Sequence, residues 1–473
     1  MEHRTGPLCA LRETPVIQRI NRFLRTPQYI LAVMGLVALS NCFSLELPVY
    51  TVAMLTCCYV CLFGDDLLAL MPIVCSFYMS VSARNSPGLH PDSVFFSWGW
   101  YMIAIVALFI GCLIFRLCTD DRIGKKAFLT KKRKMLPGLL ILGIAYVMGG
   151  LLSPAYPDTW KKSVIFALLQ FAALAVPYFL FTGAVDWKKA PKEYFPWIGF
   201  GIGGMLLALL LKTYIAHDVI RNGAIVRDMI FAGWGMYNNI GCMLAMGIPF
   251  AFYLASRYQK GWIGSVVGSL FLVGVFFTCS RGSILVGTAA YLLCIMLMTH
   301  SAKNKKSNTV VIFVFVSAIT LALLLFYQPL IEMFRDVLDR GLDPNNRNFI
   351  YEAGWKQFLQ SPVFGGSFYP LDYAPYDFAK LENFSSFIPP RWHNTVIQLL
   401  ACTGIVGLGA YIYHRYETVR LFLEDRTREK AFIACSFAVL LGCSLVDCHF
   451  FNIGPGLFYS AGLAFAECCE SRK

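Results

Sequence analysis

Long apolar runs alternate with short polar stretches along almost the whole chain, and this pattern predicts membrane-spanning helices. A span needs about 20 mainly apolar residues, and roughly fourteen stretches approach that length. Several of them are short, so twelve spans with additional re-entrant pieces is an alternative. We expect an all-α polytopic membrane protein with about 12–14 transmembrane helices.

The pattern is interrupted by one long polar interval, residues 331–392, between apolar runs at 309–330 and 394–413. Inside it, the stretch from Arg347 to Gln360 is predicted to be a helix. At helical spacing, one face of this helix would carry Ile350, Ala353, Gln357 and Phe358. Ser361 and Pro362 should end this helix. We therefore expect a large loop that contains short amphipathic helices.

These boundaries divide the chain into five parts. We expect a basic tail, a helical bundle, the large loop, a second group of spans and a short tail, at residues 1–28, 29–330, 331–392, 393–467 and 468–473.

The net charge of +13 follows the predicted topology. If the N-terminus is cytoplasmic, about two thirds of the 41 lysines and arginines fall in loops on the cytoplasmic side. This is the positive-inside pattern, so the basic balance does not indicate a nucleic-acid partner. The composition, 57% hydrophobic and 15% charged, fits a multi-pass protein. We expect a cytoplasmic (inner) membrane location, both termini in the cytoplasm, and the 331–392 loop outside.

No cofactor or metal is expected from the motifs. Most of the 17 cysteines lie inside apolar runs, where a free thiol behaves as a small hydrophobe. Cys58 and Cys61 form a CxxC pair, but no second pair or histidine lies near them in the sequence. The chain also lacks a phosphate-binding or dinucleotide-binding glycine motif.

Arginines collect on the face predicted to be outside. Arg221 and Arg227 lie in the turn at 212–234, Arg281 lies between two apolar runs, and Arg347 lies in the large loop. Forked, permanently charged guanidinium groups suit a diphosphate. The alternatives are ion pairs within the 212–234 loop and, for Arg281, a side chain that snorkels to the membrane surface.

The large loop ends at His393, where the next apolar run begins. A histidine at neutral pH can accept a proton from a sugar hydroxyl, so His393 is a candidate general base. The alternative is a structural histidine at a helix start. In that case the base is to be sought at His217, Asp218 or the turn containing Asp447 and His449.

Several short motifs then occur in a recognisable order. Tyr237-Asn238-Asn239 precedes TCSRGS (Thr278–Ser283), two spans follow, and the long loop carries Arg347 and Trp355. Pro362, Gly365-Gly366, His393-Asn394 and TGIVG (Thr403–Gly407) complete the series. From about Arg221 to Tyr413, this order resembles the superfamily of O-antigen ligases and bacterial polysaccharide polymerases.

The resemblance implies a GT-C-type membrane glycosyltransferase. Such an enzyme transfers a glycan from a polyprenyl-diphosphate carrier to a glycolipid, glycan or protein acceptor at the outer leaflet, without metal or nucleotide sugar. By motif match, His393 would be the general base, and Arg281 and Arg347 would bind the diphosphate. Arg221 and Arg227 are both candidates for further binding, with Arg391 and Asn394 supporting. The possible extra spans and the aromatic segment Phe364–Phe387 depart from the family pattern.

Two other classes of function remain open. A transporter or flippase of lipid-linked or charged solutes would use the arginines for binding and the histidine as a proton relay. Its inverted repeats would place interrupted helices at matching positions in both halves, whereas the unusual residues here lie in the second half. A structural or sensory protein would use the large loop only for docking, which leaves Arg281 unexplained.

Overall fold

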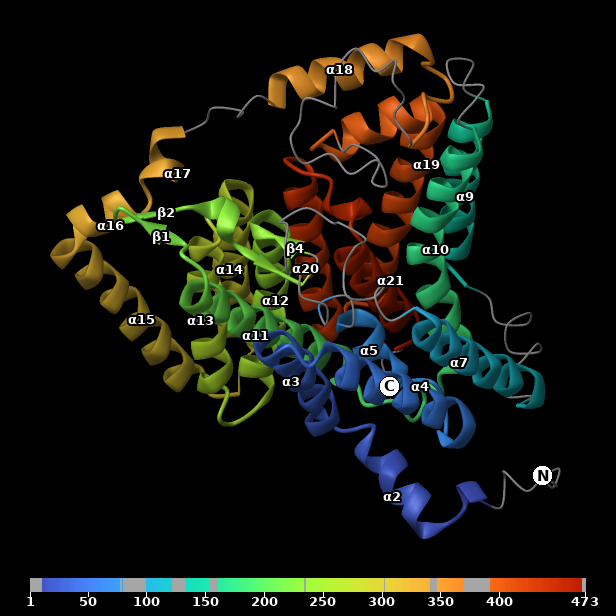
Figure 1. The fold of residues 1–473 in the computed structure, drawn as a ribbon. Coiled ribbons are helices and arrows are strands. Elements are labelled where there is room, and N and C mark those ends of the chain that lie inside the picture. Colours follow the sequence, from blue (N-terminus) through green and yellow to red (C-terminus); the bar gives the residue numbers. More distant parts are fainter. Residues whose placement is uncertain are drawn as a thin grey trace.

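The computed structural model describes residues 11–76, 79, 99–120, 133–152, 160–233, 235–301, 303–340, 347–368 and 392–469. Over these residues the chain is an all-α polytopic membrane protein, as expected (Figure 1). The first half contributes α2 (Pro15–Phe23), α3 (Pro27–Phe43), α4 (Glu46–Phe63), α5 (Leu70–Ser76), α7 (Trp100–Thr119), α9 (Leu136–Leu151), α10 (Trp160–Ala184) and α11 (Tyr194–Ala216).

The second half contains the remaining long helices and the short elements between them. They are α12 (Tyr237–Arg257), α13 (Trp262–Phe277), α14 (Arg281–Ser301), α15 (Lys305–Leu325), α16 (Tyr327–Met333), α17 (Arg335–Arg340), α18 (Arg347–Gln360), α19 (Thr395–Glu424), α20 (Arg428–Ser444), the 3-10 turn η4 (His449–Phe451) and α21 (Ile453–Cys468).

Eight helices in the described part of the chain are long and apolar enough to cross a membrane, or nine if the bent pair α2–α3 is one span. This is fewer than the number expected from the sequence, because several apolar runs form helices of 16 or 17 residues, such as α9 and α20. Another apolar stretch of the sequence, residues 66–82, contains the seven-residue α5 among its described residues.

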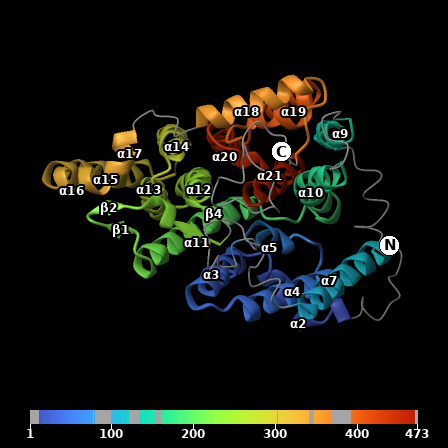
Figure 2. The ribbon, with the colours of Figure 1, turned by 45° about the horizontal axis from the view of Figure 1, so that its top comes forward.

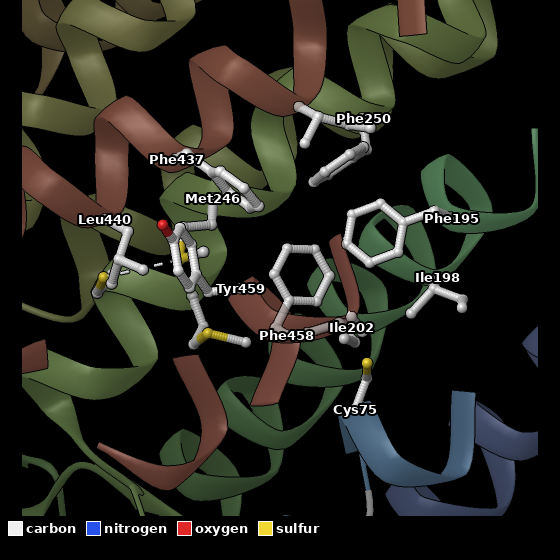
Figure 3. Close-up of a cluster of buried hydrophobic side chains, with 14 of the residues drawn as sticks. Cys75, Phe195, Ile198, Ile202, Met246, Phe250, Phe437, Leu440, Phe458 and Tyr459 are labelled. Atoms are coloured by element: carbon white, nitrogen blue, oxygen red, sulfur yellow. Dashed lines mark hydrogen bonds between the residues drawn. The ribbon is translucent and has the colours of Figure 1, made fainter. Parts of the chain in front are cut away.

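The centre of the fold is α12, which is buried continuously from Ile240 to Ser256. It packs against α11, α13, α14 and α20. Figure 3 shows how side chains from α5, α11, α12, α20 and α21 interlock beside it. The close approach depends on small residues: a Cβ on Gly199 would lie 2.2 Å from the ring of Phe250. Such small-residue contacts are typical of helix packing in membranes.

The region between α11 and α12, expected to be a hydrophilic loop, forms two short antiparallel hairpins. In the first, β1 (Ile220–Arg221) pairs with β2 (Ala224–Ile225). Asn222 and Gly223 both have positive φ, which suits an Asn-Gly hairpin turn. The 3-10 turn η2 (Arg227–Met229) follows, and then β3 (Phe231–Ala232) pairs with β4 (Gly235–Met236). These hairpins lie at the end of the bundle where α12 begins.

Helix α18 covers the residues that the sequence predicted for it, and the buried face contains Ala353 and Gln357, as expected. It packs against the first part of α19. Gly404 interrupts α19 with φ 63° and ψ −162°, a conformation that only glycine adopts readily. The segment after α18 meets this break: Gly366 N–H donates to the Ala401 carbonyl at 2.7 Å, and Ile405 N–H donates to the Pro362 carbonyl at 2.9 Å. The backbone groups freed at the break are therefore paired within the protein.

Candidate active site

A polar pocket lies where the ends of several helices meet. Its space measures about 390 Å³ including its solvent-open part, and it is lined by the start of α12, the α13–α14 turn, the first residues of α14 and α18, η2, and the turn between α20 and η4. The lining residues are Arg227, Asn238, Cys279, Ser280, Arg281, Gly282, Ser283, Arg347, Val446, Asp447 and His449. We call the end of the bundle that contains it the pocket end.

Arg281 is the first residue of α14. Cys279, in the preceding turn, has a positive φ of 54°, and Ile284 N–H makes the first bond of the helix, to the Ser280 carbonyl at 2.8 Å. The amide groups of the first turn therefore lie at the pocket wall, at the positive end of the helix dipole. A Cβ on Gly282 would lie 2.3 Å from a methyl group of Val446, so glycine permits this close approach.

Arg347 reaches the same pocket from α18. One of its terminal nitrogens donates a hydrogen bond to the Val446 carbonyl, which ties the start of α18 to the α20–η4 turn. Further along the helix, Gln357 donates to the Ala401 carbonyl at 3.0 Å. The helix that carries Arg347 is thus fixed at two points, one on each neighbouring element.

Arg227 and Arg221 differ although they are close in the sequence. The Arg227 side chain is 11% exposed, lines the pocket, and lies over the ring of Tyr237 at 5.2 Å. The Arg221 side chain is 51% exposed and pairs with Asp218 at 2.9 Å on the first hairpin. Of these two candidates, the structure brings Arg227 together with Arg281 and Arg347, and leaves Arg221 outside the pocket wall.

His393 lies beside the pocket and meets it through Asp447. Its Nδ1 lies 3.1 Å from Asp447 Oδ1, and the imidazole is 39% exposed whereas the carboxylate is 12% exposed. The other carboxylate oxygen accepts a hydrogen bond from Asn238 Nδ2 at 2.9 Å. The Cys448 N–H donates to Oδ1 at 2.7 Å. The carboxylate is therefore oriented by α12 and by its own turn, as well as by the histidine.

The charge around Asp447 favours its ionised form. Burial alone would raise the pKa of this carboxyl, but the charge and hydrogen bond of His393, together with His449 and Arg347, hold the pKa well below its usual range. An ionised carboxylate is an acceptor, so the Nδ1 of His393 is the donor in this pair. The Nε2 is then the ring atom that can accept a proton in the neutral imidazole.

Asn394 holds the start of α19 in place next to His393. Its side-chain oxygen caps the helix by accepting from Val396 N–H at 2.8 Å and Ile397 N–H at 3.1 Å. Its Nδ2 donates to the Leu445 carbonyl at 2.7 Å, which binds this cap to the end of α20. His393 itself has a positive φ of 50°. Arg391, expected to support this site, lies outside the described residues.

A polar network continues behind the pocket. His449 Nδ1 lies 3.1 Å from Asn239 Oδ1, and the Asn452 side chain donates to the same oxygen. Ser280 Oγ donates to Asn238 Oδ1 at 2.9 Å and lies 2.9 Å from Ser283 Oγ. Buried polar groups that are satisfied in this way specify one arrangement of the helices.

The sequence indicates a role for Asp447 only as an alternative to His393, and Asn238 stands out only as part of a motif. Their roles depend on contacts between residues more than 200 positions apart. The one available signal was polar residues placed at the ends of apolar runs, which does not indicate which ends meet. The described residues also contain no group of three or more His, Cys, Asp or Glu side chains arranged to hold a metal ion.

Comparison with known proteins agrees with the motifs. Residues 266–412 match the family model described as O-antigen ligase. The matched range contains Arg281, Arg347 and His393, and it ends inside α19. No curated protein sequence matches the chain. The resemblance to the O-antigen ligase and polymerase superfamily is therefore confirmed for this part of the chain.

Proposed function

We propose that this membrane protein, with its O-antigen ligase-like region at residues 266–412, is a glycosyltransferase that moves a glycan from a polyprenyl-diphosphate carrier to an acceptor hydroxyl. The observation that carries the proposal is the convergence of Arg227, Arg281 and Arg347 on one pocket whose wall includes Asp447, the partner of His393. Three separate elements supply these arginines, so the concentration of charge is a product of the fold.

The diphosphate of the donor would occupy the pocket. Three guanidinium groups and the first-turn amides of α14 provide hydrogen-bond donors and positive charge for its oxygens. These groups would also stabilise the negative charge that develops on the diphosphate as the bond to the sugar breaks. Such stabilisation acts in the transition state and therefore raises the rate of transfer.

His393 would act on the acceptor. Because Asp447 accepts from Nδ1, the free Nε2 can take the proton from the acceptor hydroxyl while its oxygen attacks the anomeric carbon. A carbon–oxygen bond forms to the acceptor, and the bond from that carbon to the diphosphate oxygen breaks. The electron pair of the broken bond remains on the diphosphate, next to the arginines. Asp447 would orient the imidazole and stabilise the imidazolium that results.

A reconstituted assay tests this proposal. The protein in proteoliposomes receives a polyprenyl-diphosphate glycan and, in parallel, a glycolipid, a second carrier-linked glycan or a protein acceptor. Wild-type protein should form the transferred product with at least one acceptor, and His393→Ala should retain donor binding but lose turnover. Failure of the wild type with all acceptors, despite donor binding, would favour the transporter interpretation.

The acceptor decides between a ligase and a polymerase. Cells that lack a ligase should accumulate long carrier-linked glycan, whereas cells that lack a polymerase should accumulate single repeat units. Measuring the length of carrier-linked glycan after deletion of the gene therefore separates these two activities.

We further propose that the pocket end faces outside and that both termini are cytoplasmic. The distribution of basic residues supports this orientation. Glu352 on α18 and Lys260 between α12 and α13 are exposed at opposite ends of the bundle. A membrane-impermeant thiol reagent should label Glu352→Cys in intact cells and should label Lys260→Cys only after permeabilisation. The opposite pattern would contradict the proposed outward-facing site.

A further inference from the structure

An apolar groove lies in the first part of the bundle, away from the pocket. Consecutive helices α3 and α4 pack mainly on different neighbours, α3 on α11 and α4 on α7. They diverge, and α5 lies between them and contacts both (Figure 2). The space that opens along α3 and α4 measures about 1210 Å³ including its solvent-open part.

The groove has a closed floor and an open rim. Leu24, Tyr29 and Val37 are buried in its floor, whereas Val52 and Leu55 on α4 are half-exposed at its rim. Its lining runs from Tyr29 to Val37 on α3, a length of about 12 Å at the rise of an α-helix. That length approaches half of the roughly 30 Å hydrocarbon core of a bilayer. The groove therefore matches a chain that spans one leaflet.

Helix α2 lies at the end of this groove and is bent by 70° from α3. Val16, Ile20 and Phe23 form an exposed apolar face with helical spacing, and the last two line the groove. Arg19 and Arg22 are exposed next to that face. An apolar face bordered by arginines is typical of a helix in the headgroup region of a membrane.

The two arginines differ from the next one in the sequence. Arg25 pairs with Asp66 at 2.7 Å, and this contact neutralises its charge. Among the described residues, neither Arg19 nor Arg22 takes part in an ion pair, although Arg22 donates to the Gln18 carbonyl. Two positive charges thus remain available at the mouth of an apolar groove.

The groove and the pocket lie at opposite ends of the bundle. Tyr194, the first residue of α11, donates to the Leu24 carbonyl at 3.0 Å, which places the start of α11 beside α2. Helix α11 then runs 23 residues to the hairpins at the pocket end. A ligand in the groove is therefore separate from one whose diphosphate occupies the pocket.

We propose that this groove is a binding site for an anionic phospholipid, with one acyl chain between α3 and α4 and the phosphate headgroup at Arg19 and Arg22. The length of the groove fits one acyl chain rather than the much longer polyprenyl chain of a carrier. The positive charge at its mouth favours an anionic headgroup over a zwitterionic one, by about fivefold in affinity for each basic residue near a membrane surface.

Lipid retention by the purified full-length protein tests the proposal. Native mass spectrometry would compare phosphatidylglycerol, phosphatidylethanolamine with the same acyl chains, and polyprenyl phosphate. The charge variant removes both arginines, Arg19→Gln/Arg22→Gln. Its matched control is Lys260→Gln/Lys303→Gln, which removes two lysines that are exposed at the same end of the bundle. The groove variant Ala53→Phe has Ala289→Phe, on an exposed face of α14, as its control.

Wild-type protein should retain phosphatidylglycerol in preference to the other two lipids. Loss of both arginines should weaken that binding roughly 30-fold, whereas the lysine control should change it little. Ala53→Phe should reduce retention even with both arginines present, and Ala289→Phe should not. Equal retention of the two phospholipids, preference for polyprenyl phosphate, or equal effects of the arginine and lysine variants would overturn the proposal.

Discussion

Two histidines in this bundle have similar sequence settings and different surroundings. His414 lies within α19 and is buried, with Nε2 at 3.0 Å from the Tyr459 hydroxyl. His393 lies just before α19, is partly exposed, and contacts the Asp447 carboxylate. Each has an arginine in its surroundings: Arg415 follows His414 in the chain, and Arg347 binds the turn that carries Asp447, the partner of His393.

The arginines in the two regions have different surroundings. Arg415 lies over the rings of Tyr411, Phe450 and Tyr459, at 4.7, 4.3 and 4.9 Å. The aromatic rings occupy the space around this guanidinium, so its contacts stabilise the bundle. Arg281 and Arg347 line a pocket that opens to solvent. The comparison shows that a histidine and an arginine in a membrane bundle suggest catalysis only where a ligand has access to both.

The largest expected effect comes from removing the His393 imidazole. His393→Ala should lower the rate of glycan transfer by about 10²–10⁴-fold, the range typical for loss of a general base. Donor binding should persist because the arginines remain. Turnover and donor affinity are measured separately in proteoliposomes. A folded variant with near-normal turnover would remove the functional distinction between the two histidines.

The carboxylate partner is the next feature to test. Asp447→Asn keeps the size of the side chain but removes the charge that orients and stabilises the imidazole, so transfer should fall by about 10²-fold. The double variant His393→Ala/Asp447→Asn should be about as slow as His393→Ala alone, because the two residues act as a unit. Additive losses in this double-mutant cycle would show that Asp447 acts independently of His393.

Substitutions of the arginines test whether the pocket binds a diphosphate. Arg281→Lys keeps one positive charge but loses the forked donor, so we expect transfer to fall by roughly 10- to 100-fold, the range for a charge-assisted hydrogen bond. The rate of transfer by Arg347→Ala should fall at least as far. Arg221→Lys is the matched control. Its rate of transfer should stay within about twofold of the wild-type rate, because the exposed pair of Arg221 with Asp218 lies outside the pocket. Equal losses at Arg221 and Arg281 would argue against diphosphate binding in this pocket.

The lowered pKa of Asp447 predicts a pH dependence of stability. Because the folded pKa lies below the ordinary value of 3.8, the ionised carboxylate stabilises the fold at every pH above that value. This contribution is lost as the pH falls through 3.8 toward the folded pKa. The free energy of unfolding of the wild type should therefore exceed that of Asp447→Asn by about 1–3 kcal/mol from pH 8 to 5. This difference should shrink below about pH 4. Thermal unfolding in detergent measures the difference, and a gap that closes between pH 8 and 5 would contradict it.

Some of this architecture can be predicted from the sequence, because apolar periodicity acts locally. The helix Arg347–Gln360 is an example: its spacing indicated both its extent and its buried face. Apolar helices of 16 residues, such as α9 and α13, are harder to assign because their length alone does not distinguish a span from a buried helix.

The site could be predicted only in part. Arg281, Arg347 and His393 stand out because each is a polar residue at an unusual position in an apolar sequence. Asp447 and Asn238 do not stand out, since their roles arise from one hydrogen bond between distant helix ends. Arg227 lines the pocket and Arg221 does not, because only the Arg227 side chain lies over the ring of Tyr237. The local composition of the 212–234 stretch does not specify which of the two side chains takes that direction.

The smallest effect is expected at His414. His414→Gln removes the imidazole but keeps a polar side chain that can bond to Tyr459, whose hydroxyl also lies 3.0 Å from Thr418. Stability should fall by about 1 kcal/mol, the usual contribution of one hydrogen bond. Turnover per folded molecule should stay within about twofold, because the surrounding rings leave no route for an acceptor hydroxyl to reach this histidine. Measuring folded fraction and initial rate on the same preparation separates the two effects. A hundredfold loss of turnover in fully folded His414→Gln would place the buried histidine in the reaction, and the contrast with His393 would then fail.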